Sequence, residues 1–375
     1  MLTDYTNYSL YNIVSNPGEF KSILEDLNSK YNNSMWRMFT TVLPASRSKN
    51  FSAIVEATNI VVKASLIGPQ GKKPLRSLEG AELYGDSIHR IGHGFKLSEE
   101  DLNKIENMNL VNDDIGYRIA RDYFNQASKL IGGFHATWNC WIYEALAKQQ
   151  ITLKSEGADS GYVADLRTPA ANKFVAKGTH EWFNSSGGYD IIADLKAMNK
   201  YADDYTDMPG NRVYVCSKAL LDKIVADAGV ISALKARMIL VDSLNAVLNE
   251  SYIRNAISTT FEIPTIVAID ERSRKEVDGV PQADSAAFDV NYISLIPVGA
   301  LFNMHNSLPN YALDNNPNTI KTMFEGGLIG AIQLFHSEPY SVITNMESWT
   351  FPAFKNPKWI VSLNSAAHSA TGVPE

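Results

Sequence analysis

Two histidines have a spacing that could support metal chemistry. His89 and His93 lie four residues apart, which on a helix is the spacing of paired zinc ligands. The glycines at positions 92 and 94 disfavour a helix here, and the residues between the histidines lack the glutamate of a zinc peptidase. We therefore expect a structural loop at 89–94 and no metal site.

Other groups of reactive side chains have weaker patterns. Asp203, Asp204 and Asp207 lack the central glycine and distal glutamate of a calcium loop, so we expect a solvated helix end. The glycines of segment 326–330 fail the spacing of a dinucleotide fingerprint, and neither a GxSxG nor a P-loop motif is present. The sequence therefore predicts no catalytic residue, cofactor or metal.

The two cysteines are expected to be small buried apolar residues. Cys140 lies in an aromatic run between Trp138 and Trp141, and Cys216 ends an apolar strand-like segment. Without a CxxC motif or a His/Cys cluster, a disulfide or redox pair is the minority interpretation.

Composition indicates a folded, soluble protein. The chain has 375 residues, of which 45% are hydrophobic and 20% charged, so we expect a sizeable core divided between two compact parts. The net charge is −7 and no Lys/Arg run exceeds two residues, which argues against a specific nucleic-acid reader. Without a signal-like N-terminus or an apolar run of membrane-spanning length, we expect synthesis in a cytoplasm and no membrane association.

The N-terminal quarter reads as two extended parts. Residues 1–50 form a polar arm with one amphipathic helix at 19–27. Residues 51–98 are turn-rich, with β-branched strands predicted at 51–57 and 60–67. A stretch this long and poor in core residues is usually functional or bound by a partner.

The clearest predicted element is one very long helix at 113–150. Apolar residues recur every three or four positions along it, which predicts a single buried stripe. At 1.5 Å per residue the helix would be about 55 Å long. The pair Gly132-Gly133 in its middle is expected to weaken or bend it.

The rest of the chain reads as an α/β segment followed by strands. We expect helices at 190–202, after a capping Ser217, and at 231–248. Strands are expected at 212–216, 263–269 and 292–297, with a charged hairpin tip at 271–279 and extended segments from 326 onward.

This order of elements resembles the major capsid proteins of tailed phages. The segment 78–102, which includes Gly80, Tyr84 and Gly85, looks like the family's passage from an extended loop to a spine helix. The stretches 163–167 and 181–190 are similar to the entry into the axial domain, and 348–363 resembles the last peripheral strands. The closest likeness is to the lambda-type capsid protein family, whose fold is shared with encapsulins.

The resemblance implies an α+β Johnson fold with five parts: an N-terminal arm (1–50), an extended β-loop (51–98), a peripheral domain (99–188) with the spine helix, an axial α/β domain (189–340), and C-terminal strands (341–375) that return to the peripheral domain. It further implies a virion shell protein rather than an enzyme, assembled in the host cytoplasm as pentamers and hexamers into an icosahedral or prolate shell around double-stranded DNA.

The resemblance also suggests partners and contact residues. Inter-subunit contacts are expected from the extended loop, and a hinge in the spine helix at Gly132 and Gly133. Partners would be further copies of the chain, a separate scaffolding protein, portal and decoration proteins, and DNA bound non-specifically. The loop residues are Lys63, Pro69, Lys72, Lys73 and Arg76.

Two alternatives remain open. An encapsulin-like compartment would use the same fold with protein cargo in place of DNA. A soluble α/β enzyme with an unrecognised active site is the alternative from a different class, and it would be a monomer or small oligomer.

Overall fold

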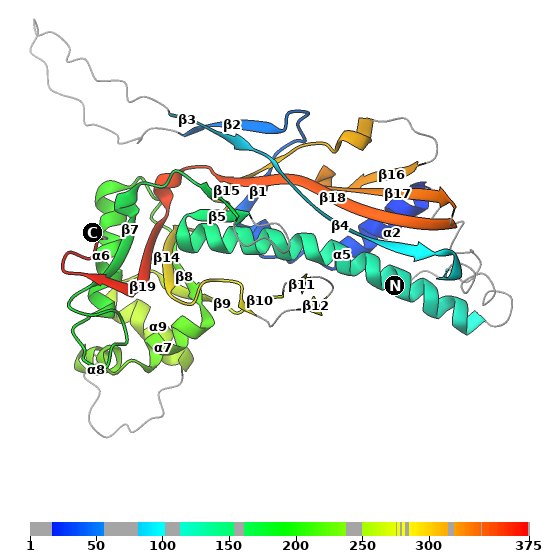
Figure 1. The fold of residues 1–375 in the computed structure, drawn as a ribbon. Helices are drawn as coiled ribbons and strands as arrows, with labels where there is room; N and C mark the ends of the chain where they lie inside the picture. The colour runs from blue at the N-terminus through cyan, green and yellow to red at the C-terminus, as the bar shows by residue number, and fades with distance from the viewer. Residues whose placement is uncertain are drawn as a thin grey trace, which may run out of the picture. The chain divides into compact units, whose positions relative to one another are not determined.

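The computed structural model describes residues 17–55, 82–101, 113–153, 161–237, 250–274, 276–277, 280–281, 285–313, 319–338 and 340–373. The chain forms two compact units. The first consists of Met1–Ser52, Gly85–Asn139 and Phe302–Ala353, and the second of Ala53–Tyr84, Cys140–Leu301 and Phe354–Glu375. Figure 1 shows the elements with their labels.

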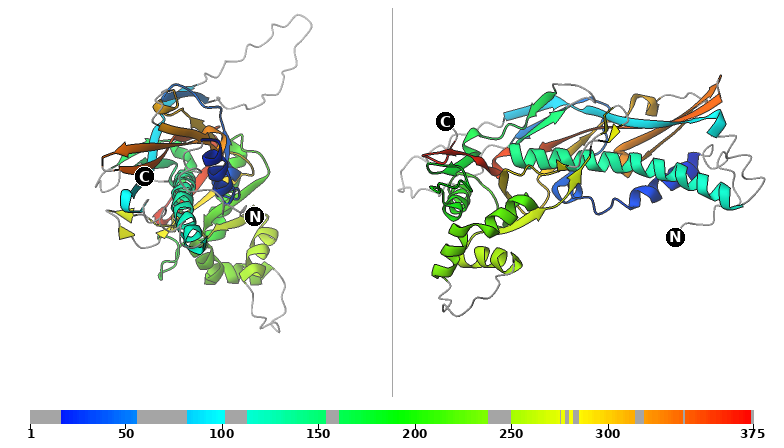
Figure 2. Two further views of the ribbon diagram at one scale, coloured as in Figure 1. Left: turned by 90° about the vertical axis from the view of Figure 1, so that its right-hand side faces the viewer. Right: turned by 60° about the horizontal axis from the view of Figure 1, so that its bottom comes forward.

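The first unit contains a six-stranded sheet in the order β1-β15-β18-β17-β16, with β4 also paired to β18. β1 and β15 are parallel, whereas β16, β17 and β4 pair in antiparallel fashion with their neighbours. Long strands β17 and β18 lie next to each other in both views of Figure 2. The strands are β1 (Thr40–Val42), β4 (His89–Ser98), β15 (Phe302–Asn306), β16 (Thr319–Phe324), β17 (Ile329–Ser337) and β18 (Tyr340–Phe354).

Helix α2 (Pro17–Ser29) and the short helix α3 (Trp36–Phe39) begin the described part of the chain. Ile23, Leu24 and Leu27 are buried, so the amphipathic helix predicted at 19–27 is confirmed. α2 packs on β16 because this face, together with Phe20, is apolar.

Helix α5 spans Asp113–Lys148, close to the predicted 113–150. The predicted stripe is buried wherever its side chains are described, from Ala127 through Phe134 and Trp138 to Ala145. The helix is continuous through Gly132-Gly133 (Figure 2). Within the described residues, no helix is long and apolar enough to cross a membrane.

The second unit contains a five-stranded sheet in the order β7-β19-β14-β8-β9. β14 is antiparallel to β19 and β8, whereas β7 with β19 and β8 with β9 form parallel pairs. The residues of β14 are almost all buried, as expected for a central strand. The strands are β7 (Lys173–Lys177), β8 (Arg212–Ser217), β9 (Thr265–Ile269), β14 (Tyr292–Pro297) and β19 (Val361–Ser369).

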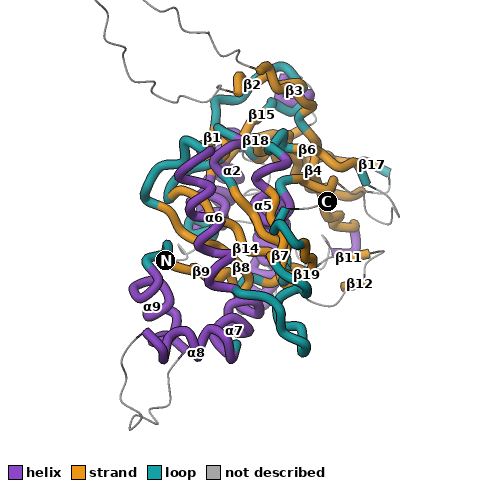
Figure 3. Tube along the Cα trace, turned by 90° about the vertical axis from the view of Figure 1, so that its left-hand side faces the viewer, coloured by secondary structure: helices purple, strands orange, loops and turns teal. Residues whose placement is uncertain are grey.

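Four helices of the second unit pack with this sheet and with one another, and Figure 3 shows α7, α8 and α9 grouped together. Their buried side chains share one core with Ile293 and Leu295 of β14. The helices are α6 (Ile191–Tyr205), α7 (Lys218–Ala226), α8 (Ala228–Arg237) and α9 (Glu250–Phe261).

Short elements complete the chain. β2 (Asn50–Val55) pairs with β3 (Glu82–Ser87), and β5 (Gln150–Leu153) with β6 (Tyr162–Asp165). Two further pairs follow β9, where the sequence predicted a hairpin: β10 (Arg272–Ser273) with β13 (Ser285–Ala286), and β11 (Glu276–Val277) with β12 (Val280–Pro281). Single 3-10 turns lie at Ala170–Asn172, Asn310–Leu313, Glu325–Gly327 and Pro357–Trp359.

Two expectations differ from the structure. The helix predicted at 231–248 is observed as α8, which ends at Arg237 before residues outside the description, and α9 was not predicted at all. The sequence analysis grouped residues 189–340 together, whereas Phe302–Ala353 belongs with the first unit. The reason is pairing: β16 and β17 hydrogen-bond in one sheet with β18, so 302–337 follows the C-terminal strand.

The predicted cap of α7 provides a first test. Ser217 Oγ accepts a hydrogen bond from Leu220 N at 3.2 Å, as the sequence indicated. We expect Ser217→Ala to lower the free energy of unfolding by about 1 kcal/mol in a denaturant titration. The control Ser232→Ala, at an exposed position within α8, should change it by less than about 0.5 kcal/mol. Equal losses in the two variants would show that the cap is not the source.

Candidate functional site

The proposed contact residues of the extended loop, Lys63, Pro69, Lys72, Lys73 and Arg76, lie outside the described residues. The structure describes the two strands that flank the loop. β2 and β3 pair with each other, so the chain leaves and re-enters the fold at one place. The contact role of the loop residues stays a prediction.

The glycine pair of α5 allows two side chains to approach the helix closely. A Cβ atom at position 132 would lie 2.6 Å from Tyr31 Oη, and one at 133 would overlap His93 Cε1. Tyr31 Oη donates to the Ser128 carbonyl at 3.0 Å, which holds the ring over Gly132. The pair therefore has a packing role in the unstrained helix, and its role as a hinge stays a prediction.

The two histidines do not form a site. Both lie on strand β4, where a four-residue separation corresponds to about 13 Å. His93 Nε2 lies 2.7 Å from the Leu130 carbonyl, and its ring meets Phe134 edge-on. Within the described part of the chain, no three His, Cys, Asp or Glu side chains are placed to hold a metal ion. The expectation of a structural role without a helix is confirmed, although the segment is a strand rather than a loop.

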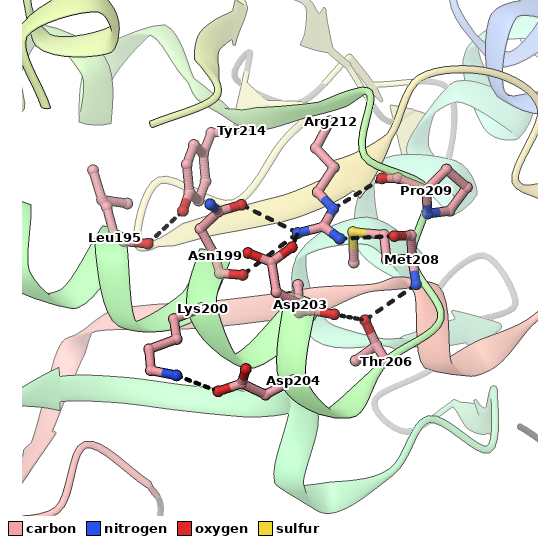
Figure 4. A network of polar contacts seen from close by, with 11 residues as sticks. Leu195, Asn199, Lys200, Asp203, Asp204, Thr206, Met208, Pro209, Arg212 and Tyr214 are labelled. Atoms are coloured by element: carbon pink, nitrogen blue, oxygen red, sulfur yellow. Dashed lines mark hydrogen bonds and ion pairs between the residues drawn. The ribbon is translucent and has the colours of Figure 1, made fainter. Parts of the chain in front are cut away.

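The aspartates at the end of α6 are bound by cations of the chain itself. Asp203 Oδ1 accepts from Arg212 Nη1 at 2.7 Å, and Asp204 pairs with Lys200 one turn earlier (Figure 4). Both carboxylates remain largely exposed, which agrees with the predicted solvated helix end.

Arg212 fixes the connection between α6 and β8. Its guanidinium is 6% exposed, and besides Asp203 it donates to the carbonyls of Met208 and Pro209 at 2.7 and 2.8 Å (Figure 4). A buried guanidinium is tolerable only when its donors are satisfied, and here the turn carbonyls provide acceptors. The side chain thus defines the path of the turn that begins β8.

The cysteines have no redox role in this arrangement. They do not form a disulfide, and Cys216 is fully buried while Cys140 is partly buried. Burial raises the pKa of Cys216 to about 12, so its thiol stays protonated. The buried, apolar expectation is confirmed for Cys216 and only in part for Cys140.

A buried polar network in the first unit was not predicted from the sequence. Trp36 Nε1 donates to His135 Nδ1 at 2.9 Å, and His135 Nε2 lies 2.8 Å from Asn28 Oδ1. Asn28 Nδ2 in turn donates to Glu325, which also binds Arg37. The network therefore joins α2, α3, α5 and the turn after β16 through side-chain contacts.

The hydrogen bonds of this network define the tautomer of His135. Because Nδ1 accepts from Trp36, the proton of the neutral ring is on Nε2, where it is donated to Asn28. The ring is 2% exposed, and Tyr31 stacks on it with centroids 5.0 Å apart. Burial lowers the pKa of His135 to about 4, an effect that the charge of Glu325 only partly opposes.

A second buried carboxylate lies in strand β18. Glu347 binds Arg90 of β4, with Nε 2.6 Å from Oε2, and accepts from Trp349 Nε1 at 3.2 Å. Lys49 Nζ lies 3.8 Å from the centroid of the Trp349 ring and donates to the Leu308 carbonyl. Desolvation lowers the pKa of Lys49 although Glu347 opposes the shift. These contacts tie the segment before β2 to the sheet.

The neutral state of His135 predicts a pH dependence of stability. Its folded pKa of about 4 lies below the ordinary 6.5, so the unfolded chain binds the proton first as the pH falls. The stabilisation is complete above pH 6.5 and is lost between pH 6.5 and 4. Relative to His135→Gln, the wild-type free energy of unfolding should fall by up to roughly 3 kcal/mol more between pH 7 and 4.

The comparison between variants matters because Asp194 titrates in the same window with the opposite sign. Burial raises the pKa of Asp194 to about 6, so its protonation stabilises the fold below that pH in both proteins. His336→Gln, at an exposed position of β17, is the matched control and should retain the wild-type profile. Parallel profiles for wild type and His135→Gln would contradict the assignment of a neutral ring.

Comparisons with known proteins identify the fold. No family model and no curated protein sequence matches the chain. A solved structure described as a prophage capsid protein from E. coli CFT073 superposes with a TM-score of 0.57 at 12% identity, over 93% of this chain and 98% of that chain. A phage-related protein from Bordetella bronchiseptica RB50 has a TM-score of 0.46 at 12% identity, covering 94% and 98% of the two chains.

The mature capsid of bacteriophage PhiM1 is also similar, with a TM-score of 0.44 at 11% identity over 88% and 87% of the two chains. The likeness to the prophage protein extends over nearly the full length of both chains. The predicted fold is therefore confirmed: the chain has the α+β fold of tailed-phage capsid proteins.

Proposed function

We propose that this chain is the major capsid protein of a tailed phage. The observation that supports this most strongly is the structural likeness to the prophage capsid protein, with a TM-score of 0.57 across 93% of one chain and 98% of the other. Coverage of that extent includes both compact units rather than one shared module. The function that fits is self-assembly into pentamers and hexamers, which close into a shell around double-stranded DNA.

In this proposal the two units have different places in the shell. The unit built on the first part of α5 and strands β15–β18 is the core of the peripheral domain. The unit with the sheet β7-β19-β14-β8-β9 supplies the axial domain, which gathers around the five-fold and six-fold axes. The extension between β2 and β3 reaches a neighbouring subunit.

The partners follow from the same proposal. Further copies of the chain are the principal partner, and a separate scaffolding protein, portal and decoration proteins join them in the virion. The net charge of −7 suits a container that contacts DNA only non-specifically, since phosphates are repelled rather than gripped. An encapsulin-like compartment is the nearest rival, because it would differ only in what the shell encloses.

The test is the assembly state of the recombinant chain. We expect closed shells, tubes or free pentamers and hexamers in size-exclusion chromatography and negative-stain microscopy, with the chain expressed alone or together with its neighbouring genes. Nucleic acid inside particles made in the phage-infected host separates a capsid from a protein-filled compartment. A monodisperse monomer or dimer under both expression conditions would refute the shell function.

A second prediction concerns the glycine pair of α5. If α5 bends at this point between pentamer and hexamer, Gly132→Ala with Gly133→Ala should disturb shell size or closure in micrographs. The control Ala136→Gly, at an exposed position of the same helix, softens the helix by about 1 kcal/mol and should leave shells unchanged. Because added Cβ atoms meet Tyr31 and His93, circular dichroism must first show that the subunit folds. Normal shells from the folded double variant would exclude a hinge here.

A further inference from the structure

The ribbon β5–β6 has one covered and one uncovered edge. Its two strands are antiparallel, with Ile151 opposite Ala164 and Thr152 opposite Val163. On the β5 side, Thr152 N and Oγ1 donate to the carboxylate of Glu144 at 2.9 and 2.6 Å. Helix α5 therefore covers the outer edge of β5 with a side chain instead of a third strand.

The Thr152 contact also defines which groups point outward on β6. Since its amide is directed at Glu144, Thr152 and Val163 form a non-hydrogen-bonded pair within the ribbon. In such a pair the N–H and C=O of both residues point away from the partner strand. The main-chain groups of Val163 thus face the outer edge of β6, where no described residue forms a main-chain hydrogen bond with them.

The side chains at this edge are apolar and exposed. Tyr162 is 54% and Val163 47% exposed, whereas Ala164 and Ile151 are fully buried. A strand edge with apolar side chains and outward main-chain groups is a template for another strand, and soluble proteins usually cover or charge such an edge. Only Asp165, at the end of β6, provides a charge.

The chain contains a segment with matching properties. Residues 60–67 read Ile-Val-Val-Lys-Ala-Ser-Leu-Ile, rich in β-branched residues and without an acidic side chain. They belong to the 26 residues (56–81) between the paired strands β2 and β3, outside the described part of the chain. A hairpin of that length extends at most about 40 Å beyond the β2–β3 pair, enough to reach another subunit.

Charge favours the same pairing. The segment 56–81 has four basic residues and two acidic ones, in a chain with a net charge of −7. The body of a second copy is therefore opposite in sign to this segment, and Asp165 marks the receiving edge.

We propose that residues 60–67 of one copy add as a strand to the outer edge of β6 in a second copy. The pairing would form main-chain hydrogen bonds at Val163 and cover the apolar side chains of Tyr162 and Val163. This inference rests on the proposed shell function and identifies the receiving surface on the neighbouring subunit.

Cysteine cross-linking between two variants tests the pairing directly. Val163→Cys and Val62→Cys are prepared separately, mixed before assembly and treated with a short bifunctional maleimide. We expect a cross-linked dimer in the mixture above the level that either variant, or the wild type with its own two cysteines, gives alone. A double variant of one chain that cross-links only within the monomer would overturn the second-copy arrangement.

A substitution test separates this inference from the shell function. Tyr162→Glu with Val163→Glu should reduce shell formation at least tenfold, while Val290→Glu, at another exposed valine of the same unit, should not. Circular dichroism and thermal unfolding of the soluble subunit must remain as in the wild type. Wild-type yields of shells from the folded double variant would refute the role of this edge but leave the shell function intact. Failure of the wild-type chain itself to assemble would refute the shell function.

Discussion

The burial of helix α5 is the constraint on which the rest of the fold depends. From Ile131 onward the helix has fully buried residues on several faces, including Trp138, Ile142, Tyr143 and Leu146. A helix that is apolar around most of its circumference must be enclosed, and each unit encloses its own part. In the first unit the indole of Trp138 donates to Thr350 of β18, and in the second the Leu146 carbonyl accepts from Ser294 of β14.

Enclosure at this density leaves little room for unpaired polar atoms, so the two units satisfy theirs internally. Tyr143 of α5 donates to Glu271, and Lys148 pairs with Asp289 at 2.8 Å. His135 solves the same problem by remaining neutral, since a second ring proton would face the Trp36 donor. These contacts connect segments more than 90 residues apart, which makes the burial of α5 specific to one chain path.

The sequence predicts what is local and periodic. The long helix, the cap at Ser217 and strands β8 and β14 follow from spacing and residue type, and the order of these elements indicated the fold. The contacts of Asn28 with His135 and Glu325 could not be predicted, because each residue is ordinary in its own segment and the partners lie 107 and 297 positions away. The grouping of 302–337 was missed for the same reason, since strand partners are non-local. Helix α9 did carry a signal in the buried series Ile253, Ile257 and Phe261.

The contrast between internal contacts and surface contacts bears on assembly. Within each unit the buried carboxylates and cations have partners, as Arg212 has at the start of β8 and Glu347 in β18. The edge of β6 instead presents outward main-chain groups and apolar side chains, which on an isolated subunit would promote aggregation. A rigid, internally satisfied subunit can tolerate such an edge if every copy covers that of its neighbour. Contacts of this kind are individually weak, which allows misplaced subunits to dissociate, and they become stable together only when the shell closes.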